Sequence, residues 1–337
     1  MSKGPVTPTI AVSGLSKRFG EVLAVDGLEM TVQSGELYGL LGPNGAGKTT
    51  TINLLTGLAR PDAGRISIGD IDCSRNPKAA QHLLGVVPDE SNLYPELTGY
   101  DNLCFCGALY GLPRAERERR AAELLEAFRL TEAGGRRFGG YSRGMKRRLT
   151  IAAAMVHRPP ILFLDEPTTG IDVASARQVR QMVAQLHSEG TTILLTTHYI
   201  EEAERLCDRV AFIVRGRIVR VAPLEELMRQ MQGRYLLELV VPGARPEVGA
   251  ALAAALPQVM VREAAVGRIR LESAAPIAVA PPVRWLEEHG LQVTEARRVQ
   301  PSLEEVFVEI TGIEAQAMRG DNGGGRGARG GGQGGAA

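Results

Sequence analysis

Apolar and polar positions alternate over short runs near the start of the chain. Between Ile10 and Leu41 these runs are separated by the turn-forming pairs Phe19-Gly20 and Ser34-Gly35. A period of two is typical of strands, and glycine suits the turns between them. The last run, LYGLL, is mostly apolar and leads directly into GPNGAGKTT. The pattern therefore predicts a sheet that delivers the chain into a glycine-rich loop.

The middle of the chain changes from helical to strand patterns. Helical periodicity dominates from about residue 98 to 158, and after Pro159-Pro160 three buried-strand patterns follow: ILFLD, TTILLTT and RVAFIV. Apolar strands separated by helices are typical of a parallel α/β sheet. We therefore predict a first domain over residues 1–230, with a helical subdomain at about 91–158.

The remainder predicts a second, smaller domain at residues 231–312. Its segments follow a β-α-β-β-α-β order before a final helix. In turn they are YLLELVV, an Ala/Leu-rich helix ending at Pro257, VMVRE, RIRLES, a helix around Val283 to His289, and LQVTEARRV. That order is ferredoxin-like, an α+β arrangement. Residues 313–337 are rich in glycine and predict a disordered tail, because such a segment cannot bury enough surface to order itself.

Composition and charge narrow the class of protein. A chain of 337 residues with 44% hydrophobic residues suggests about two domains with cores of their own. The 39 Lys and Arg nearly balance the 38 Asp and Glu, which gives no case for nonspecific binding to nucleic acid or to an anionic membrane. The four scattered cysteines favour reduced thiols in a cytoplasmic protein. No signal peptide or apolar run of about 18 residues is present, so we expect no membrane span.

The loop GPNGAGKTT has the residues needed to hold phosphate. Gly42, Gly45 and Gly47 let the backbone N–H groups approach an anion, and the following helix adds its positive N-terminal end. Lys48 supplies a charge for the β- and γ-phosphates, and Thr49 supplies a hydroxyl for magnesium. A chance glycine-rich turn is the alternative, but the loop lies between a predicted strand and a predicted helix. We therefore predict a nucleotide site here.

Two later strand ends complete this chemistry. ILFLDE ends in Asp165 and Glu166, and both can reach a nucleotide at the carboxyl edge of a sheet: Asp165 toward magnesium and Glu166 toward a water beyond the γ-phosphate. TTILLTTH ends in His198, placed to contact the γ-phosphate and Glu166. A lone histidine is more often structural, and that interpretation of His198 stays open at this point.

The segment YSRGMKRR begins a further predicted helix. Ser142 is a suitable N-cap, and Leu149, Ala152, Ala153 and Val156 follow the spacing of an apolar helix face. Three cations in its first turn oppose the helix dipole, which favours an anion or an acidic partner near that end. A solvated turn is the alternative.

Taken together, these motifs resemble the ATP-binding subunit of an ABC transporter of the ABC-2 exporter type. GPNGAGKTT matches the Walker A motif, ILFLDE the Walker B motif, TTGID the D-loop and TTH the H-loop, while YSRGM stands in place of the signature LSGGQ. The resemblance covers residues 10 to about 220. It implies a P-loop ATPase domain with a RecA-like parallel core, an antiparallel β subdomain and an α-helical subdomain.

The resemblance also implies partners and site residues. Two subunits would sandwich two ATP molecules, and a separate membrane permease would carry the substrate at the cytoplasmic face of the cell membrane. Ser142 and Gly144 of one subunit would contact the γ-phosphate held by Lys48 of the other, with Asp172 signalling across the interface and Phe19 stacking on adenine. The alternative for Phe19 is that this strand hydrophobe belongs to the core. The catalytic residues implied are Lys48, Glu166 and His198. Those implied for ATP are Phe19, Gly42, Pro43, Asn44, Gly45, Ala46, Gly47, Lys48, Thr49, Thr50, Ser142, Gly144 and Asp172. Those implied for Mg²⁺ are Thr49, Asp89 and Asp165.

Three residues depart from the family pattern. Arg143 replaces the first glycine of the signature and Met145 its glutamine, which leaves Ser142 and Gly144 as the matching contacts. Asp89 stands where the family has the Q-loop glutamine. A carboxylate binds magnesium more strongly than an amide but is one methylene shorter, so we expect Asp89 to be a metal ligand.

By the same resemblance, the stretch from Ser91 to Tyr100 is the surface that we expect to meet the permease. Leu93 and Leu97 suit core packing equally well, and Tyr94 is the residue we expect to make contact. In the family this region receives a cytoplasmic helix of the membrane subunit.

Other functions remain as alternatives. A soluble ABC ATPase acting on ribosomes or nucleic acid usually carries two motif sets or a coiled-coil insertion, and one set with no heptad run is present here. A binding-only regulatory subunit would not need Glu166 and His198, and a P-loop kinase would not need YSRGM. No residue of this chain identifies the cargo, because the translocation path belongs to the partner. Export is the direction that the family favours.

Overall fold

A computed structural model describes residues 9–230, 233–299 and 302–313. Contacts divide this chain into two compact units, a larger one that includes the residues up to Val221 and those from Thr311 on, and a second one covering Ala222–Ile310. Each unit has its own core of buried apolar side chains. Apart from Ile313, the predicted glycine-rich tail lies outside the described residues.

The larger unit is organised around a six-stranded sheet in the order β10-β9-β3-β8-β7-β6. Its strands are β3 (Leu37–Leu41), β6 (Leu84–Val87), β7 (Ile161–Asp165), β8 (Thr192–Thr197), β9 (Arg209–Val214) and β10 (Arg217–Pro223). β3 pairs in parallel with β8 and β9, and β7 pairs in parallel with β6 and β8. Every residue of β3, β7 and β8 is buried, as expected for a parallel sheet covered on both faces. The predicted parallel core is confirmed.

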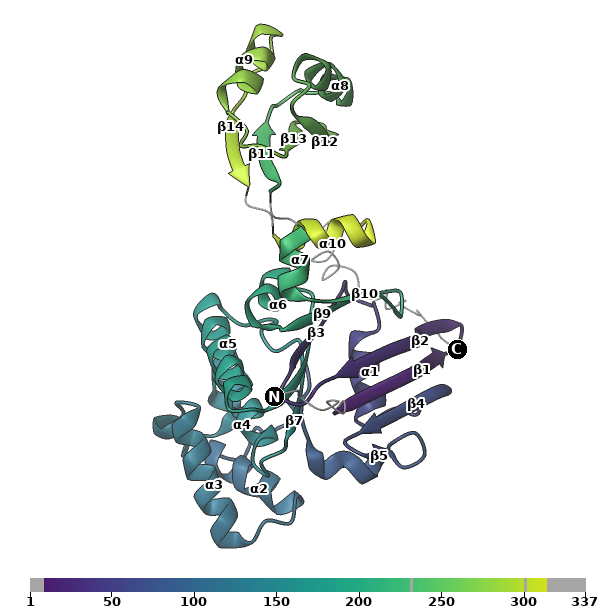
Figure 1. Ribbon diagram of the computed structural model, residues 1–337. Coiled ribbons are helices and arrows are strands. Elements are labelled where there is room, and N and C mark those ends of the chain that lie inside the picture. Colours follow the sequence, from purple (N-terminus) through teal and green to yellow (C-terminus); the bar gives the residue numbers. More distant parts are fainter. Residues whose placement is uncertain (1–8, 231–232, 300–301, 314–337) are drawn as a thin grey trace, which may run out of the picture. The chain divides into compact units, whose positions relative to one another are not determined.

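An antiparallel sheet in the order β2-β1-β4-β5 lies beside this core (Figure 1). Its strands are β1 (Ile10–Phe19), β2 (Val22–Val32), β4 (Ala63–Ile68) and β5 (Ile71–Asp72). Ile10 and Leu15 of β1 share one hydrophobic cluster with Tyr38 of β3 and Ile52 of the first helix. The antiparallel sheet therefore packs over the phosphate-loop strand and its helix.

Six helices complete the described part of the larger unit. They are α1 (Lys48–Leu55), α2 (Gly99–Leu109), α3 (Arg114–Ala127), α4 (Arg143–Ala154), α5 (Val173–Ser188) and α6 (Ile200–Leu206), with short 3-10 turns at Pro77–Leu83, Thr131–Ala133 and Phe138–Gly140. α2, α3 and α4 group together, as the helical subdomain was predicted to do (Figure 1). Thr98 and Ser142 cap α2 and α4, because their hydroxyl oxygens accept hydrogen bonds from backbone N–H groups of the first turn.

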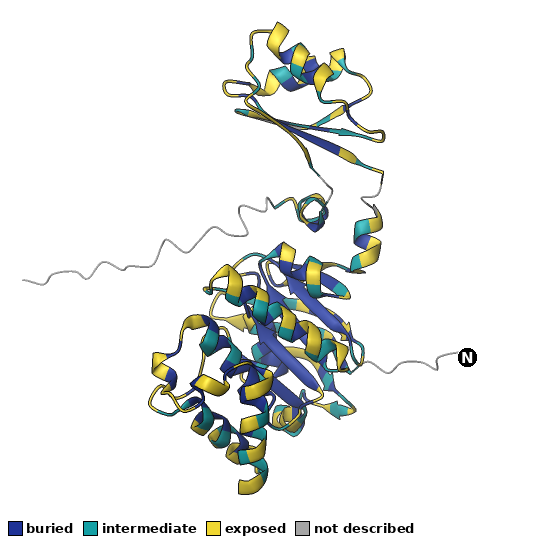
Figure 2. Cartoon of the chain, turned by 90° about the vertical axis from the view of Figure 1, so that its left-hand side faces the viewer, coloured by how far each residue is buried: buried dark blue, intermediate teal, exposed yellow. Residues whose placement is uncertain are grey.

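The second unit has the predicted β-α-β-β-α-β order. Its elements are α7 (Leu224–Gln230), β11 (Tyr235–Val240), α8 (Pro246–Ala255), β12 (Met260–Ala265), β13 (Arg268–Ser273), α9 (Ala280–Glu288), β14 (Glu295–Val299) and α10 (Leu303–Thr311). The sheet order is β12-β13-β11-β14 with antiparallel neighbours. α8 and α9 cover one face of this sheet (Figure 2). This is the ferredoxin-like arrangement.

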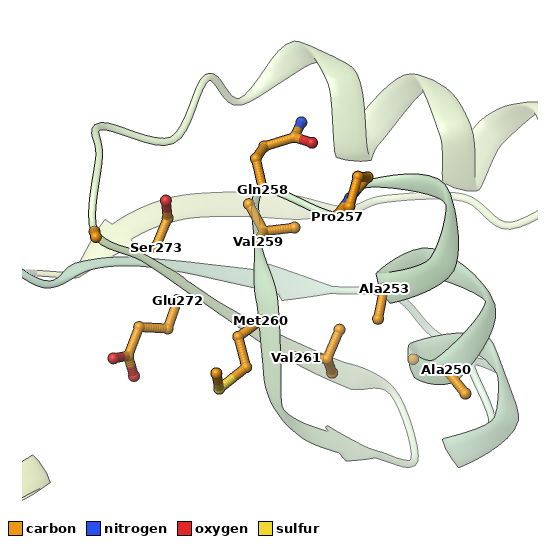
Figure 3. A pocket seen from close by; sticks show the side chains of 11 residues that line it. Ala250, Ala253, Pro257, Gln258, Val259, Met260, Val261, Glu272 and Ser273 are labelled. Atoms are coloured by element: carbon orange, nitrogen blue, oxygen red, sulfur yellow. The ribbon is translucent and has the colours of Figure 1, made fainter.

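Two local features of the second unit are not evident from its strand pattern. β14 begins at Glu295 rather than at Leu291, because β11 ends at Val240, which pairs with Glu295. The small side chains Ala250 and Ala253 of α8 leave a shallow recess beside the edge strand β12 (Figure 3).

Within the described ranges, no helix has the length and apolar character needed to cross a membrane.

Candidate active site

The sheet topology brings the ends of three strands to one edge. Leu41 of β3 pairs with Thr197 of β8, and Asp165 of β7 pairs with Thr196 of the same strand. The residues that follow these strands are Gly42, Glu166 and His198, and they therefore emerge side by side. In an open α/β sheet the carboxyl edge of parallel strands is where ligands bind.

The phosphate loop depends on glycine for close packing as well as for backbone freedom. A Cβ on Gly42 would lie 2.2 Å from the Ile213 carbonyl oxygen, and a Cβ on Gly47 would lie 2.4 Å from that of Ala24. Gly47 also has a φ of 102°, which favours glycine. The loop opens into α1, whose first N–H groups have no partners within the helix and are available to an anion.

Lys48 turns back over this loop. Its Nζ donates hydrogen bonds to the carbonyl oxygens of Gly42 (2.8 Å) and Pro43 (3.1 Å). The same Nζ lies 3.0 Å from Oε1 of Glu166, and both side chains are almost fully buried. The loop lysine and the strand-end glutamate, 118 positions apart in sequence (166 minus 48), thus form an ion pair.

Glu166 is held by three side chains from separate segments. Besides the Lys48 pair, its Oε2 lies 2.6 Å from Nδ1 of His198 and accepts a 3.0 Å hydrogen bond from the Thr169 hydroxyl. Its backbone N–H donates to the Thr196 carbonyl at 3.1 Å. The φ of Glu166 is 48°, which is uncommon for a residue other than glycine and marks a constrained position.

The environment keeps Glu166 ionised. Burial acts to raise the pKa of its carboxyl, but the hydrogen bond to His198 and the charge of Lys48 outweigh burial and lower the pKa overall. At neutral pH the side chain is therefore a carboxylate, which accepts hydrogen bonds and orients or deprotonates a water molecule.

The predicted magnesium ligands are oxygen donors of suitable kind. Asp165 is buried, and its Oδ1 accepts a 2.5 Å hydrogen bond from the Thr196 hydroxyl, which fixes the carboxylate at the strand end. Thr49 is exposed at the start of α1. Among the described residues no group of three or more His, Cys, Asp or Glu gathers as a metal site. The oxygen donors of Thr49 and Asp165 suit Mg²⁺, which is bound by one or two carboxylates and by phosphate oxygens rather than by a full protein cage.

Asp89 has a different partner in this structure. Its Oδ1 lies 3.6 Å from Nη2 of Arg147, and its side chain is 52% exposed. Partial burial raises the pKa of Asp89, Arg147 opposes that rise, and the carboxylates of Asp165 and Glu166 add to it. The Asp89 carboxylate is thus close enough to interact electrostatically with the carboxylates of Asp165 and Glu166, while it faces the Arg147 guanidinium.

The signature segment and the D-loop pack against each other. A Cβ on Gly144 would lie 2.1 Å from Oγ of Ser175, so this position has no room for a side chain. Asp172 caps α5 by accepting hydrogen bonds from the backbone N–H (2.9 Å) and hydroxyl (2.7 Å) of Ser175. Arg143, which replaces the first signature glycine, donates to the Gly170 carbonyl at 3.3 Å. In the described part of the chain, no hydrogen bond joins the side chain of Ser142 or Asp172 to the phosphate loop.

Phe19 lies outside the core. Its side chain is 52% exposed at the end of β1, and Nζ of Lys17 lies 5.3 Å from the ring centroid. The alternative that Phe19 is a buried strand residue is therefore excluded, and the ring is accessible for stacking.

Three further residues of the site were not singled out from the sequence. Thr169 bonds the Glu166 carboxylate, Thr196 bonds Asp165, and Arg147 is buried against backbone carbonyls. The two threonines lie in TTGID and TTILLTTH, so their proximity to strand ends was a usable signal. Arg147 gave no signal in the sequence, because its partners are main-chain atoms.

The cations near the start of α4 have partners within the chain as well as any anion at the helix end. Arg147 and Arg148 both donate hydrogen bonds to backbone carbonyl oxygens.

Both the sequence and the structure of this chain are similar to those of known proteins. The model of the ABC transporter family matches residues 25–169. The chain is 35% identical to the linearmycin resistance ATP-binding protein LnrL of Bacillus subtilis, over 90% of this chain and 98% of that protein. It is 40% identical to the daunorubicin resistance ATP-binding protein DrrA3 of Streptomyces coeruleorubidus, over 90% and 96%. It is 43% identical to the Nod factor export ATP-binding protein I of Burkholderia lata, over 71% and 78%.

Solved structures of ATP-binding cassettes resemble about two thirds of this chain. An ATP-binding subunit of an ABC transporter is 33% identical with a TM-score of 0.60, covering 66% of this chain and 92% of that one. A dimeric ATP-binding cassette in a post-hydrolysis state, bound to ADP and phosphate, is 25% identical with a TM-score of 0.59, covering 64% and 98%.

Proposed function

This chain belongs to the ABC transporter family as one of its ATP-binding subunits, and from that premise we propose that it hydrolyses ATP to drive export through a separate membrane protein. Its relatives are named for drug resistance and for Nod factor export. Those names favour an exporter subunit over the soluble alternative that acts on ribosomes or nucleic acid.

The observation that carries the proposal is the position of Glu166. Its carboxylate lies between Lys48 of the phosphate loop and His198 of the neighbouring strand, at 3.0 and 2.6 Å. A nucleotide-binding protein without hydrolysis needs the lysine but has no use for a buried carboxylate fixed beside it. The arrangement therefore suits attack by water on the γ-phosphate.

In the mechanism that we propose, the γ-phosphate replaces the carboxylate as the partner of Lys48. Glu166 is then released from the lysine but keeps His198 and Thr169, and it orients or deprotonates the attacking water. Lys48 and the N–H groups at the start of α1 stabilise the charge that develops on the phosphate oxygens. His198 holds the carboxylate in line with the γ-phosphate.

Magnesium is the expected companion of ATP. Thr49 and Asp165 are the residues that would hold it, with Asp89 as a further carboxylate ligand. When bound, Mg²⁺ neutralises charge on the β- and γ-phosphate oxygens.

We propose that the working form is a head-to-tail homodimer. Ser142 and Gly144 of one subunit would meet the nucleotide held by Lys48 of the other, with Asp172 at the interface and Phe19 on adenine. The dimeric cassette with ADP and phosphate supports this arrangement. The Gly144 and Ser175 packing supports it too, because it fixes the signature segment and the D-loop as one surface.

The membrane partner is proposed to bind at Tyr94, which would hold this subunit at the cytoplasmic face of the cell membrane. Leu93 is buried, whereas Tyr94 is 50% exposed. The Tyr94 backbone exchanges two hydrogen bonds with the Asn102 side chain, and its ring packs edge-on against Phe105 at 5.1 Å between centroids. An exposed aromatic held in place in this way is well suited to an interface.

The test is the conservative variant Glu166→Gln. It keeps the size of the side chain but removes the charge, so we expect ATP binding and ATP-dependent dimerisation to be retained while turnover falls by two orders of magnitude or more, as for loss of a general base (on the order of 10²–10⁴). ATPase rate, nucleotide affinity and dimer fraction are measured on the same preparation. Glu189→Gln, at an exposed glutamate after α5, is the matched control. Undiminished turnover in Glu166→Gln would exclude this mechanism.

A further inference from the structure

Arg147 is a buried arginine whose role the motifs do not assign. It lies five positions after the N-cap Ser142 in α4 and is 7% exposed. A guanidinium at such depth is costly unless every donor has a partner. The role of Arg147 can therefore be inferred from the groups that its guanidinium contacts.

The guanidinium bonds the backbone of two distant segments. Nη1 donates to the Pro88 carbonyl at 2.6 Å, and Nη2 donates to the Asp89 carbonyl at 2.6 Å. Nη2 also reaches the carbonyl of Glu166 at 3.4 Å. A planar fork spans neighbouring acceptors in this way, whereas the single ammonium of lysine does not.

These contacts fix the peptides around the hydrolytic carboxylate. The N–H of Glu166 is bonded to Thr196, and its carbonyl faces Arg147, so both sides of a residue with φ of 48° are restrained. A residue in that conformation persists where its surroundings hold it. Arg147 is therefore one of the groups that set the direction of the Glu166 side chain.

We propose that Arg147 is a positioning residue that connects the N-terminal end of α4 to the Asp89 loop and to the backbone of Glu166. A contact made by Ser142 or Gly144 at the start of α4 is thereby transmitted to the carboxylate that activates water. The inference rests on the proposed function, since it concerns the rate of that hydrolysis.

Arg148 provides a matched comparison. It is the next residue of the same helix, is partly buried, and also donates to two carbonyl oxygens, those of Phe128 (3.1 Å) and Arg129 (3.2 Å). Its partners belong to the segment that follows α3 rather than to the strand ends. Replacing Arg148 removes similar packing and similar hydrogen bonds without touching the peptide of Glu166.

The experiment compares Arg147→Lys with Arg148→Lys in the full-length protein. We expect Arg147→Lys to lower kcat by about tenfold or more, since small displacements of catalytic groups have effects of up to about 10²-fold. The KM for ATP and the ATP affinity of the phosphate loop should stay within about twofold, because no contact to that loop is lost. Arg148→Lys should keep the wild-type kcat. If Arg147 and Arg148 both served only fold stability, both variants would have lower thermal stability, and Arg147→Lys would not show a fall in kcat at unchanged KM.

Each outcome decides the matter. Equal kcat values for the two variants, with active wild-type protein, would overturn the inference and leave the proposed function intact, whereas inactive wild-type protein would overturn both. If Arg147→Lys does not fold, Arg147→Gln avoids a buried ammonium and should show the same selective loss of kcat. Failure of both to fold, while Arg148→Lys and Arg148→Gln do, would assign Arg147 to fold stability and reject the positioning role.

Discussion

At the scale of single residues, His157 shows how burial creates a dependence on pH away from the active site. Its ring stacks on Tyr110 with 3.5 Å between centroids, and Nε2 lies 3.1 Å from the Leu84 carbonyl oxygen. Burial lowers the pKa of His157 to about 4, and the carbonyl contact only partly opposes this. The histidine is therefore neutral in the folded protein at physiological pH.

The sign of the effect on stability follows from this lowered pKa. An unfolded histidine titrates near pH 6.5, so the contribution of His157 is fully present above that pH and is lost as pH falls toward about 4. The full effect is on the order of 3 kcal/mol at about 1.4 kcal/mol per pKa unit. We expect His157→Phe, which keeps the stack but cannot be protonated, to flatten the fall in unfolding free energy between pH 6.5 and 4.5. Denaturant unfolding across this range is the measurement; His289→Gln, at an exposed histidine, should keep the wild-type slope, and a wild-type slope in His157→Phe would refute the assignment.

The site residues that could be predicted from the sequence are those whose position relative to a predicted strand indicates their role. Lys48, Glu166 and His198 each follow a predicted strand, so a parallel sheet alone places them at one edge. The conformation of Glu166 and the role of Arg147 were not accessible, because both depend on main-chain carbonyls, which every residue has. Asp89 was expected to be a metal ligand; in this structure it faces Arg147, a partner that lies 58 positions away.

At the scale of elements, the start of α4 and the start of α5 pack with no space between them. The Cβ that an alanine would add at Gly144 meets Oγ of Ser175 at 2.1 Å and its Cβ at 2.5 Å. The hydroxyl can rotate away, but the Cβ of Ser175 cannot. The two helix starts therefore keep their spacing only while residue 144 is glycine.

We expect Gly144→Ala to destabilise the protein by roughly 1–3 kcal/mol through overpacking. The gain in helix propensity, about 1 kcal/mol at most, offsets only part of this. Gly140→Ala, at a position with open space, should have little effect, and Gly144→Ala with Ser175→Gly should recover much of the loss. Thermal unfolding and ATP-dependent dimerisation of the Glu166→Gln protein are measured for each. A stable and fully dimerising Gly144→Ala protein would contradict the role of this contact.

The elements themselves were largely foreseeable from periodicity, and their ends were not. The apolar face of α4 contains Leu149, Ala152 and Ala153, which are buried as the spacing predicted, and Val156, two residues beyond the end of the helix at Ala154, is buried as well. β14 starts later than its sequence suggests, because the length of a strand is decided by its pairing partner. A pattern of side chains carries no information about where the neighbouring strand stops.

At the scale of the whole molecule, the proposed function requires a separate membrane protein, and Tyr94 is where we expect it to bind. Tyr94→Ala should abolish or strongly weaken co-purification with a multi-span membrane protein from detergent-solubilised membranes, since a central aromatic contact is worth about 2 kcal/mol or more. The ATPase rate of the isolated protein should not change, because Tyr94 contacts no residue of the active site described above. Tyr235→Ala, at a tyrosine of similar exposure in the second unit, is the control. Co-purification at the wild-type level would place the docking surface elsewhere.

The ion pair between Lys48 and Glu166 also has a consequence for the energy supply of the cell. In the mechanism proposed above, phosphate displaces this carboxylate from the lysine, so the free energy of the pair is subtracted from the affinity for ATP. Each 1.4 kcal/mol given up in this way raises the ATP concentration needed for half occupancy tenfold. Under the proposed mechanism, the strength of this pair therefore sets how much ATP the cell must supply before hydrolysis begins.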